Sequence, residues 1–357
     1  MSTFLAMPRF RAGGAAAVAG SAPAPRRLED SFGRVATDLR VSLTDRCNLR
    51  CTYCMPAEGL DWMPGEEVLT DDEVLRLISV GVTRLGISTV RLTGGEPLLR
   101  KNLEQLVSDI AALQPAPSIA LTTNGIGLAA RAERLAAAGL TRINVSLDTL
   151  SAATFKQITR RPRLDDVLAG VRAARAAGLR PVKINTVLMR GLNDHEAVEL
   201  LRWAVAEEVE LRFIEQMPLD AQHAWQRSEM ITASEIHARL GQHFQLVEDP
   251  EDALARGSAP AELFRVAGTD ARVGIIAAVS KPFCGSCDRV RLTADGQVRN
   301  CLFAREESDL RTPLRAGASD DELADRWVTA VAGKRAGHGI DDPSFLQPDR
   351  PMSAIGG

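Results

Sequence analysis

The amino-acid sequence predicts an α/β fold in which helices surround a largely parallel sheet. Two observations support this prediction. Short apolar or β-branched runs alternate with longer segments of helical periodicity, as expected for repeated βα units. Polar and glycine residues cluster where each run ends, which is typical of the sheet edge that carries the active site in parallel α/β folds. A chain of 357 residues is long enough for one large barrel or for two domains.

Six strands are expected, which is too few for a closed eight-stranded barrel. They are 38–44, 89–93, 118–123, 142–147, 182–188 and 210–216. Helices are expected between them, at 71–85, 101–113, 128–138, 165–177 and 194–206. Several of these helices end on a glycine, as helix C-termini often do: Gly86, Gly139 and Gly178.

The pattern changes after about residue 220. A helix is expected near 233–243, and Asp295-Gly296 is expected to form the turn of a hairpin. No clear linker separates this part from the strands before it. We therefore interpret residues 221–357 as an extension that packs against a core of residues 33–220.

Residues 1–32 are expected to be a disordered leader. The first 28 residues contain no acid, which fits either an Ala-rich bacterial extension or an organelle transit peptide. No stretch approaches the roughly 18 apolar residues of a membrane span, and the pattern of a secretory signal is missing. We therefore expect a protein of the bacterial cytoplasm without membrane contact, with organelle targeting as the open alternative.

Charge and cysteine content narrow the class of function. The formal charge of −3 argues against nucleic-acid binding, which usually requires a basic surface, so an anion site must be local. The cysteine spacing is poor for structural disulfides, and thiolates in a reduced compartment favour a metal. All six cysteines fall into two triplets: Cys47, Cys51 and Cys54, then Cys284, Cys287 and Cys301.

The first triplet has the spacing Cys47-x3-Cys51-x2-Cys54 and follows the first expected strand. Three such thiolates can hold three irons of a [4Fe–4S] cube and leave the fourth iron open to another ligand. Zinc is the alternative, although three cysteines without a nearby histidine form no obvious four-ligand site. The segment CNLRCTYC resembles the motif of radical S-adenosylmethionine (SAM) enzymes.

The resemblance to radical SAM enzymes implies a chemistry and a set of contacts. SAM binds the open iron, an electron from the cluster splits it, and a 5′-deoxyadenosyl radical takes a hydrogen atom from the substrate. The motif GGEP, which includes Gly95, resembles the loop that meets the SAM amino group. Tyr53, Ser146 and Met217 stand where the family contacts SAM, although each could equally be a packing residue.

The second triplet, Cys284-x2-Cys287-x13-Cys301, is followed by closely spaced arginines. Structural zinc with a remote fourth ligand remains an alternative here, although the five histidines lie well away in the sequence. Arg289 and Arg291 alternate along an extended segment and therefore point to the same side. Two guanidinium groups beside a cluster indicate a phosphate-like anion, whereas solvated surface arginines are the simpler alternative.

From about residue 33 onward the chain resembles the MoaA-type GTP 3′,8-cyclases, radical SAM enzymes of molybdenum cofactor synthesis. The motifs include LRVSLTDRCNLRCTYC, VRLTGGEPLLR, LTTNG, INVSLD, VKINTVL, LRFIEQMP, FCGSCDRVRLTADG and a terminal Gly-Gly. The resemblance implies an incomplete (β/α)6 barrel of the TIM type, with a C-terminal extension that carries a second [4Fe–4S] cluster. The open iron of that cluster is expected to hold the guanine of GTP.

The resemblance also implies the residues that contact GTP. They are Arg40, Arg91, Thr122, Lys183, Arg289 and Arg291. Five cations around a triphosphate can each form charge-assisted hydrogen bonds worth roughly 1.5–3 kcal/mol. The family has a lysine where this chain has Thr89. Gly356-Gly357 is expected to enter the active site, where residues without side chains fit a narrow channel, and a frayed terminus is the alternative.

The implied reaction is the conversion of GTP to (8S)-3′,8-cyclo-7,8-dihydroguanosine 5′-triphosphate by a lyase that uses SAM and a reductant. The radical removes the C3′ hydrogen of GTP, and the ribose radical attacks C8 of guanine. The implied partners are a downstream cyclic pyranopterin monophosphate synthase and an unidentified electron donor, and a homodimer is compatible with the sequence. A peptide-modifying radical SAM enzyme and a non-catalytic iron–sulfur or zinc regulator are the two alternatives.

Overall fold

The computed structural model describes residues 26–248 and 256–356, whose strands belong to one twelve-stranded sheet. The strands are β1 (Asp38–Ser42), β2 (Thr89–Thr93), β3 (Ser118–Thr123), β4 (Arg142–Ser146), β5 (Val182–Val187), β6 (Glu210–Ile214), β7 (Leu246–Glu248), β8 (Glu262–Val266), β9 (Arg272–Ile276), β10 (Arg289–Leu292), β11 (Gln297–Arg299) and β12 (Ser308–Asp309). Their order across the sheet is β12-β11-β10-β1-β2-β3-β4-β5-β6-β9-β8-β7.

The centre of this sheet contains the six expected strands. β1 to β6 pair in chain order and run parallel. All six begin at the predicted residue, and none ends more than two residues from its predicted end. The α/β fold with an open, largely parallel sheet is therefore confirmed.

The C-terminal part adds strands to both ends of the central six. β10 pairs parallel with β1, and β11 and β12 follow it in antiparallel pairs. β9 pairs parallel with β6, and β8 and β7 follow it in antiparallel pairs. The turn predicted at Asp295-Gly296 joins β10 to β11, and Gly296 adopts a left-handed φ of 79° there. Sequence patterns missed β7, β8, β9 and β12, which are all short.

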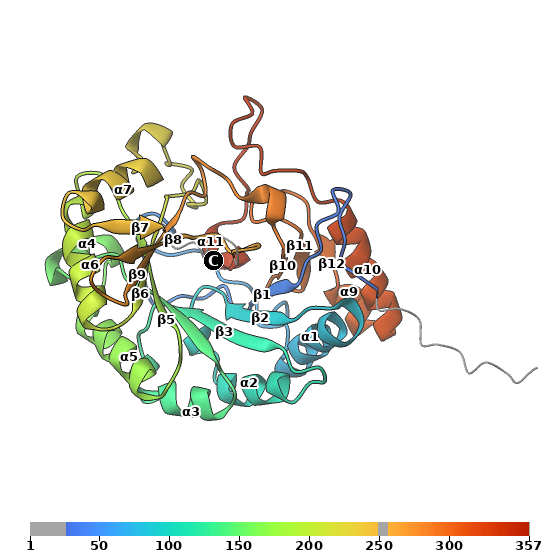
Figure 1. Cartoon of the computed structure of the whole chain (residues 1–357). Helices are drawn as coiled ribbons and strands as arrows, with labels where there is room; N and C mark the ends of the chain where they lie inside the picture. The colour runs from blue at the N-terminus through green and yellow to red at the C-terminus, as the bar shows by residue number, and fades with distance from the viewer. Residues whose placement is uncertain (1–25, 249–255, 357) are drawn as a thin grey trace, which may run out of the picture.

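Helices lie outside the curved sheet and form most of a ring around it (Figure 1). They are α1 (Asp71–Leu85), α2 (Leu103–Ala111), α3 (Ala132–Ala137), α4 (Ala152–Thr159), α5 (Leu164–Ala176), α6 (Ala197–Ala206), α7 (Ala233–Gly241), α9 (Arg311–Arg315), α10 (Asp320–Ala332) and α11 (Met352–Ile355). The expected helices all occur, but the predictions that began at residues 128 and 194 each start with a separate 3-10 turn. Sequence patterns missed α4, α9, α10 and α11.

Local signals fix the ends of several helices. Thr70 caps α1, because its side chain accepts from the Glu73 backbone N–H while the Glu73 carboxylate accepts from the Thr70 N–H. The helix ends at Gly86, whose φ of 77° suits a residue without a side chain. Thr232 and Glu235 form the same reciprocal pair at the start of α7. These caps explain why the starts of both helices could be predicted.

The two faces of the central strands differ sharply. One face carries aliphatic side chains such as Leu39, Val90, Ile143 and Ile184, which are fully buried in the core that the helices cover. The alternate positions, which face the interior of the curved sheet, are largely polar or charged and only partly buried in most strands. A TIM barrel normally fills this interior with branched aliphatic side chains. Here the interior is built for a polar occupant instead.

Residues 26–32, the described part of the predicted leader, pack against the rest of the fold. Leu28 is fully buried, and Glu29 forms a β-bridge with Val35. The expectation of a disordered segment 1–32 is therefore wrong for residues 26–32, and residues 1–25 lie outside the described residues. Across the two described ranges, no helix is long and apolar enough to cross a membrane.

The C-terminal segment returns to the middle of the molecule. Arg350 forms two 2.8 Å hydrogen bonds with the Asp295 carboxylate, and the Met352 N–H donates to the Leu219 carbonyl at 3.1 Å. These contacts lead into α11, which lies near the centre of the ring (Figure 1). Gly356 at its end fits between strands, because an added Cβ would lie 2.7 Å from Thr93 Cγ2 and 3.2 Å from Ser42 Cβ.

Candidate active site

The loop that carries the first cysteine triplet packs against the glycines that follow β2. The Gly95 N–H donates to the Thr44 carbonyl at 2.7 Å, and the Glu96 N–H donates to the Arg46 carbonyl at 2.8 Å. A Cβ on Gly95 would overlap with the backbone oxygens of Asp45 and Arg46. Only glycine therefore allows this close approach, and Gly95 positions the loop rather than leaving it free.

The three thiols of the first triplet lie near one another and are largely withdrawn from water. Burial raises the pKa of all three, to about 12 for Cys54, and the charges of neighbouring cysteines add to this increase for Cys51 and Cys54. The Leu49 N–H donates to Cys47 Sγ at 3.4 Å, and the Asn124 amide does so at 3.8 Å. Bound iron would reverse the pKa shifts, because a metal stabilises the thiolate form. This donor set fits an iron–sulfur cluster.

Tyr53 ties this loop to the end of β4. Its hydroxyl donates to Asp148 Oδ2 at 2.8 Å, and the other oxygen of Asp148 accepts from the Val187 N–H at 2.9 Å. Burial raises the pKa of Asp148 to about 6, against the effect of these hydrogen bonds. The side chain of Tyr53 therefore fixes the loop, and a SAM contact through its backbone stays a prediction.

Glu96 is a fully buried carboxyl group that joins the ends of β2 and β3. It accepts from Thr123 Oγ1 at 2.6 Å, the Asn124 N–H at 2.7 Å and the Leu98 N–H at 2.9 Å. Burial nevertheless dominates and raises the pKa of Glu96 to about 7. The carboxyl group thus holds together two of the loops that surround the first triplet.

Ser146 and Met217 lie at the same edge of the sheet as the first triplet. Ser146 ends β4, is half-buried, and stands in register with Asn185 of β5. Met217 follows β6 and packs partly buried against Met230 and Val279. Their positions fit the predicted SAM contacts, which stay predictions.

Three arginines stand side by side on the interior face of the sheet. Arg40 of β1 is in register with Arg91 of β2 on one side and with Arg291 of β10 on the other. In the next row Arg289 stands beside Asp38. The Asp38 carboxylate accepts from Arg91 at 3.4 Å and lies 3.9 Å from Arg40 Nε. Four of the six predicted GTP contacts are thus brought together by strands from both ends of the chain.

Two of these arginines, Arg40 and Arg91, are short of partners. Within the described residues, the Nε atoms of Arg40 and Arg91 and one oxygen of Asp38 are buried without a hydrogen-bond partner. Burial lowers the pKa of Arg40 well below its usual value, and the charge of Arg291 adds to this effect. Burial likewise lowers the pKa of Arg291 to about 10. Buried donors and like charges at this spacing favour an anion as the missing partner.

Lys183 belongs to a second group of charges on the other side of the interior. Burial and the charge of Arg212 lower the pKa of Lys183 to about 8, and Arg142 and Arg91 add to this effect. Glu210 offsets part of this charge, because it lies 3.7 Å from Lys183 Nζ and pairs with Arg212. Sequence reasoning missed Arg142, Arg212 and Glu210, although each stands at an alternate, interior position of an expected strand.

Thr122 on β3 and Thr89 on β2 are uncharged residues at interior positions of the sheet. Thr122 is half-buried on β3, and its hydroxyl accepts from the Asn144 amide at 3.3 Å. Thr89 stands beside Asp38 in register, at the position where a lysine is expected from the family. The partners of Asp38 are therefore arginines of β1 and β2, and Thr89 adds no charge to the row.

The second triplet lies next to the arginine row. Cys284 begins a 3-10 turn directly before β10, Cys287 follows this turn, and Cys301 follows β11. Burial raises the pKa of Cys284. Burial also opposes ionisation of Cys287, but the positive charges of Lys334 and Arg289 outweigh it, so the pKa of Cys287 is lowered. Three thiols beside cations again fit an iron–sulfur cluster with an anionic ligand set.

His338 lies beside the second triplet, although all five histidines are remote from it in sequence. Its backbone N–H contributes a hydrogen bond to Cys284. One ring nitrogen pairs with the Ala278 carbonyl at 3.2 Å, and the other accepts from the Ile340 N–H at 3.1 Å. Both ring nitrogens are thus engaged by the backbone. Within the described residues, no three His, Cys, Asp or Glu side chains are placed around a single metal ion.

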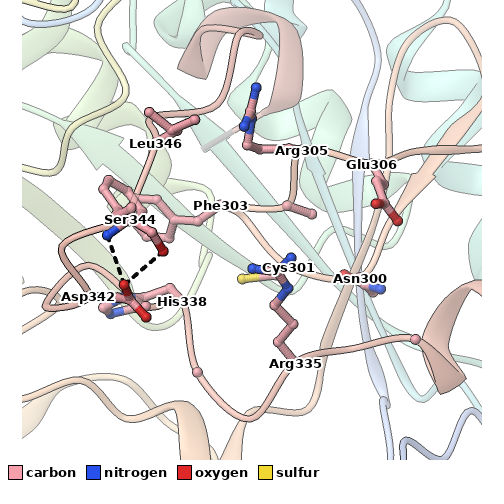
Figure 2. Close-up of a pocket in the computed structure, with 15 residues that line it drawn as sticks. Asn300, Cys301, Phe303, Arg305, Glu306, Arg335, His338, Asp342, Ser344 and Leu346 are labelled. Atoms are coloured by element: carbon pink, nitrogen blue, oxygen red, sulfur yellow. Dashed lines mark hydrogen bonds between the residues drawn. The ribbon is translucent and has the colours of Figure 1, made fainter.

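A cavity of about 310 Å³ adjoins the second triplet. Figure 2 shows Cys301 in its wall, with the sulfur pointing to the side on which Phe303 and His338 lie. The rings of Phe303 and His338 are 5.0 Å apart, and Phe303 also contacts Phe345. The second triplet therefore has an aromatic wall on one side and the arginine row on the other.

Comparisons with known proteins first define the class. A model of the radical SAM superfamily matches residues 41–204, and a model of the molybdenum cofactor synthesis C region matches residues 209–340. Among solved structures, Streptococcus suis SuiB aligns with a TM-score of 0.60 at 12% identity, and the alignment covers 90% of this chain and 77% of the SuiB chain. The enzyme anSMEcpe with bound AdoMet aligns with a TM-score of 0.55 at 16% identity, and the alignment covers 85% of this chain and 79% of the anSMEcpe chain. The chain is a radical SAM enzyme, a class that uses SAM with an iron–sulfur cluster.

Two close relatives define the family. A GTP 3′,8-cyclase of Streptomyces coelicolor is 63% identical over 330 residues, which cover 92% of this chain and 96% of the relative. A GTP 3′,8-cyclase of Mycolicibacterium smegmatis is 60% identical over 354 residues, with coverage of 97% and 96%. The chain belongs to the family of GTP 3′,8-cyclases, and the predicted family resemblance is confirmed.

The fit of Gly95 against the cysteine loop can be tested with Gly95→Ala. The added Cβ must push the loop away, so we expect SAM affinity to fall at least about fivefold, because such overlap costs roughly 1–3 kcal/mol. Iron in the first triplet should fall as well. Binding of SAM and iron content are measured on anaerobic protein. Gly65→Ala is the control, because nothing lies within 4 Å of its added Cβ. Equal SAM affinity in both variants would contradict the expected role.

Glu96 predicts a dependence of stability on pH. Because its pKa is raised from 4.5 to about 7 in the folded protein, its contribution to stability is complete below pH 4.5 and is lost as pH rises through 7. Relative to Glu96→Gln, which stays neutral, the wild type should lose roughly 2 kcal/mol between about pH 5.5 and 8. Thermal unfolding of both proteins across this range measures the difference. A constant difference would show that Glu96 does not titrate there.

Proposed function

We propose that this protein converts GTP to (8S)-3′,8-cyclo-7,8-dihydroguanosine 5′-triphosphate with SAM and a reductant, the first step of molybdenum cofactor synthesis. The close relatives named GTP 3′,8-cyclase support this reaction. The single structural observation that carries it is the row of Arg40, Arg91 and Arg291 on the interior face, in which the Nε atoms of Arg40 and Arg91 are buried without a hydrogen-bond partner. A triphosphate supplies the charge and the oxygen acceptors that this row requires.

We interpret the six central strands and their helices as an incomplete (β/α)6 barrel, and the extension as the carrier of a second [4Fe–4S] cluster. The pairing of β10 with β1 supports this interpretation, because it brings Cys284 and Cys287 next to the central strands. The proposed cluster ligands are Cys47, Cys51 and Cys54 for the first, and Cys284, Cys287 and Cys301 for the second. The proposed boundary between the barrel and the extension stays near residue 220.

In this proposal the two ends of the interior have different functions. When bound at the first triplet, the cluster and SAM supply a 5′-deoxyadenosyl radical. Gly95 and Tyr53 hold the loop that carries this triplet, and Ser146 and Met217 line the neighbouring strand ends. The second triplet holds the guanine, which leaves C3′ of the ribose between the two centres. Proximity and exclusion of water then direct the hydrogen transfer to that carbon.

The cations have the task of holding the triphosphate. The proposed contacts are Arg40, Arg91, Thr122, Lys183, Arg289 and Arg291, and Arg142 and Arg212 lie close enough to strengthen the local potential. In the described structure Arg291 donates to the Gly356 carbonyl. The C-terminal tail therefore occupies one donor that a phosphate would use, and substrate binding must exchange or share this contact.

A peptide-modifying radical SAM enzyme is the main alternative. SuiB, which has also been solved with a precursor peptide, shares the fold with a TM-score of 0.56, but its 12% identity carries no more than the fold. A peptide substrate gives no reason for the buried arginine row. A non-catalytic regulator would need neither that arginine row nor the close packing of Gly95 against the loop that carries the first triplet.

The same proposal includes the partners of the reaction. The product would pass to a cyclic pyranopterin monophosphate synthase, and an electron donor that we do not identify would reduce the first cluster. A homodimer stays a prediction. A bacterial cytoplasm is the proposed location, and the two relatives described above are bacterial proteins.

GTP that carries deuterium at C3′ tests the reaction directly. With the anaerobically reconstituted protein, SAM and dithionite, we expect deuterium to appear in 5′-deoxyadenosine, because the radical takes the C3′ hydrogen. Mass spectrometry of the nucleoside product measures the label, and GTP labelled at C2′ is the control. Unlabelled 5′-deoxyadenosine formed together with the cyclised product would overturn the assignment of C3′.

A further inference from the structure

Lys334 is a buried ammonium group in direct contact with the second triplet. Its residue is 5% exposed and follows the end of α10. The Nζ atom lies 3.3 Å from Cys287 Sγ, 3.3 Å from the Cys287 carbonyl and 2.9 Å from the Arg289 carbonyl. An ammonium group has three N–H donors, and these three acceptors use all of them.

The charge of Lys334 needs an anion, and the nearest one is the sulfur. In the described part of the chain, no carboxylate lies within salt-bridge distance of this ammonium group. A buried cation is costly unless an opposite charge compensates it, and hydrogen bonds to two carbonyls and a neutral thiol supply no such charge. The Cys287 thiolate of an iron–sulfur cluster supplies such a charge.

Arg34, another buried cation at this triplet, has a different set of partners. It pairs with Asp30 at 2.6 Å and donates to the carbonyls of Cys284, Ala336 and Arg335. These contacts satisfy its charge and hold three backbone segments together. The charge of Arg34 is thus balanced by a carboxylate, whereas the charge of Lys334 is directed at the sulfur.

We propose that Lys334 is a positioning residue of the second cluster: its ammonium group fixes the sulfur of Cys287 and makes the cluster easier to reduce. This inference rests on the proposed function, because it assumes a cluster at the second triplet. Hydrogen bonds and positive charge at a ligand sulfur stabilise the more negative, reduced state of a cluster and so raise its reduction potential. The same side chain fixes the backbone of Arg289, and it thereby couples the cluster to the strand that carries two of the proposed phosphate ligands.

The test uses full-length protein with Cys47, Cys51 and Cys54 replaced by Ala, so that only the second cluster remains. Iron content and the EPR signal of the reduced protein establish this cluster in the parent. The midpoint potential is then measured by anaerobic redox titration in the parent, Lys334→Met and Lys334→Arg. Lys156→Met is the matched control, since it removes one exposed lysine on α4, whose end contacts the loop of the first triplet, which holds no cluster in the parent.

Lys334→Met should retain its iron and show a more negative midpoint potential than the parent. Lys334→Arg, which keeps a charged donor, should recover part of the shift, and Lys156→Met should show none. An unchanged potential in Lys334→Met with full iron content would overturn the proposal. Loss of the cluster from both Lys334 variants would make the residue structural and overturn it as well. A parent without any second cluster would instead refute the proposed function.

Discussion

The arrangement of the whole protein depends on one electrostatic constraint, the placement of like charges on the inner face of a parallel sheet. Arg40, Arg91 and Arg291 stand in register on three neighbouring strands, and Asp38 is the carboxylate nearest to them. Such a row is costly in a half-buried interior unless an anion enters it. The apolar core on the other face of the strands holds these side chains in place and thereby offsets the cost of keeping them together.

The C-terminal extension supplies the remaining charges of this row. β10 joins the central sheet beside β1, so that Arg289 and Arg291 reach the row begun by the N-terminal strands. The same connection brings the second triplet to this side of the interior, while the first triplet lies on the loop after β1. The tail returns to the middle and contacts Arg291 through the Gly356 carbonyl. The interior of the curved sheet thus has a thiol triplet at each side and cations on the strands near them.

Sequence patterns alone predicted the parts of this arrangement that depend on local signals. The six parallel strands, the starts of α1 and α7, and the cysteine triplets follow from periodicity and spacing. The contacts that cross the chain could not be read in this way. Lys334 reaches Cys287 across 47 residues, and His338 reaches the second triplet through its backbone rather than its ring. Such pairings are set by the tertiary fold, and no local pattern encodes them.

The relative affinities for GTP and guanosine test most directly whether the interior row binds a triphosphate. Several charge-assisted hydrogen bonds of roughly 1.5–3 kcal/mol each predict that anaerobic, reconstituted protein binds GTP at least about 100-fold more tightly than guanosine. Arg289→Ala should reduce the preference for GTP over guanosine at least about tenfold without changing guanosine binding. Arg265→Ala, at an exposed position of β8, should have no effect. Equal affinities for GTP and guanosine in the wild type would contradict the proposed role of the arginine row.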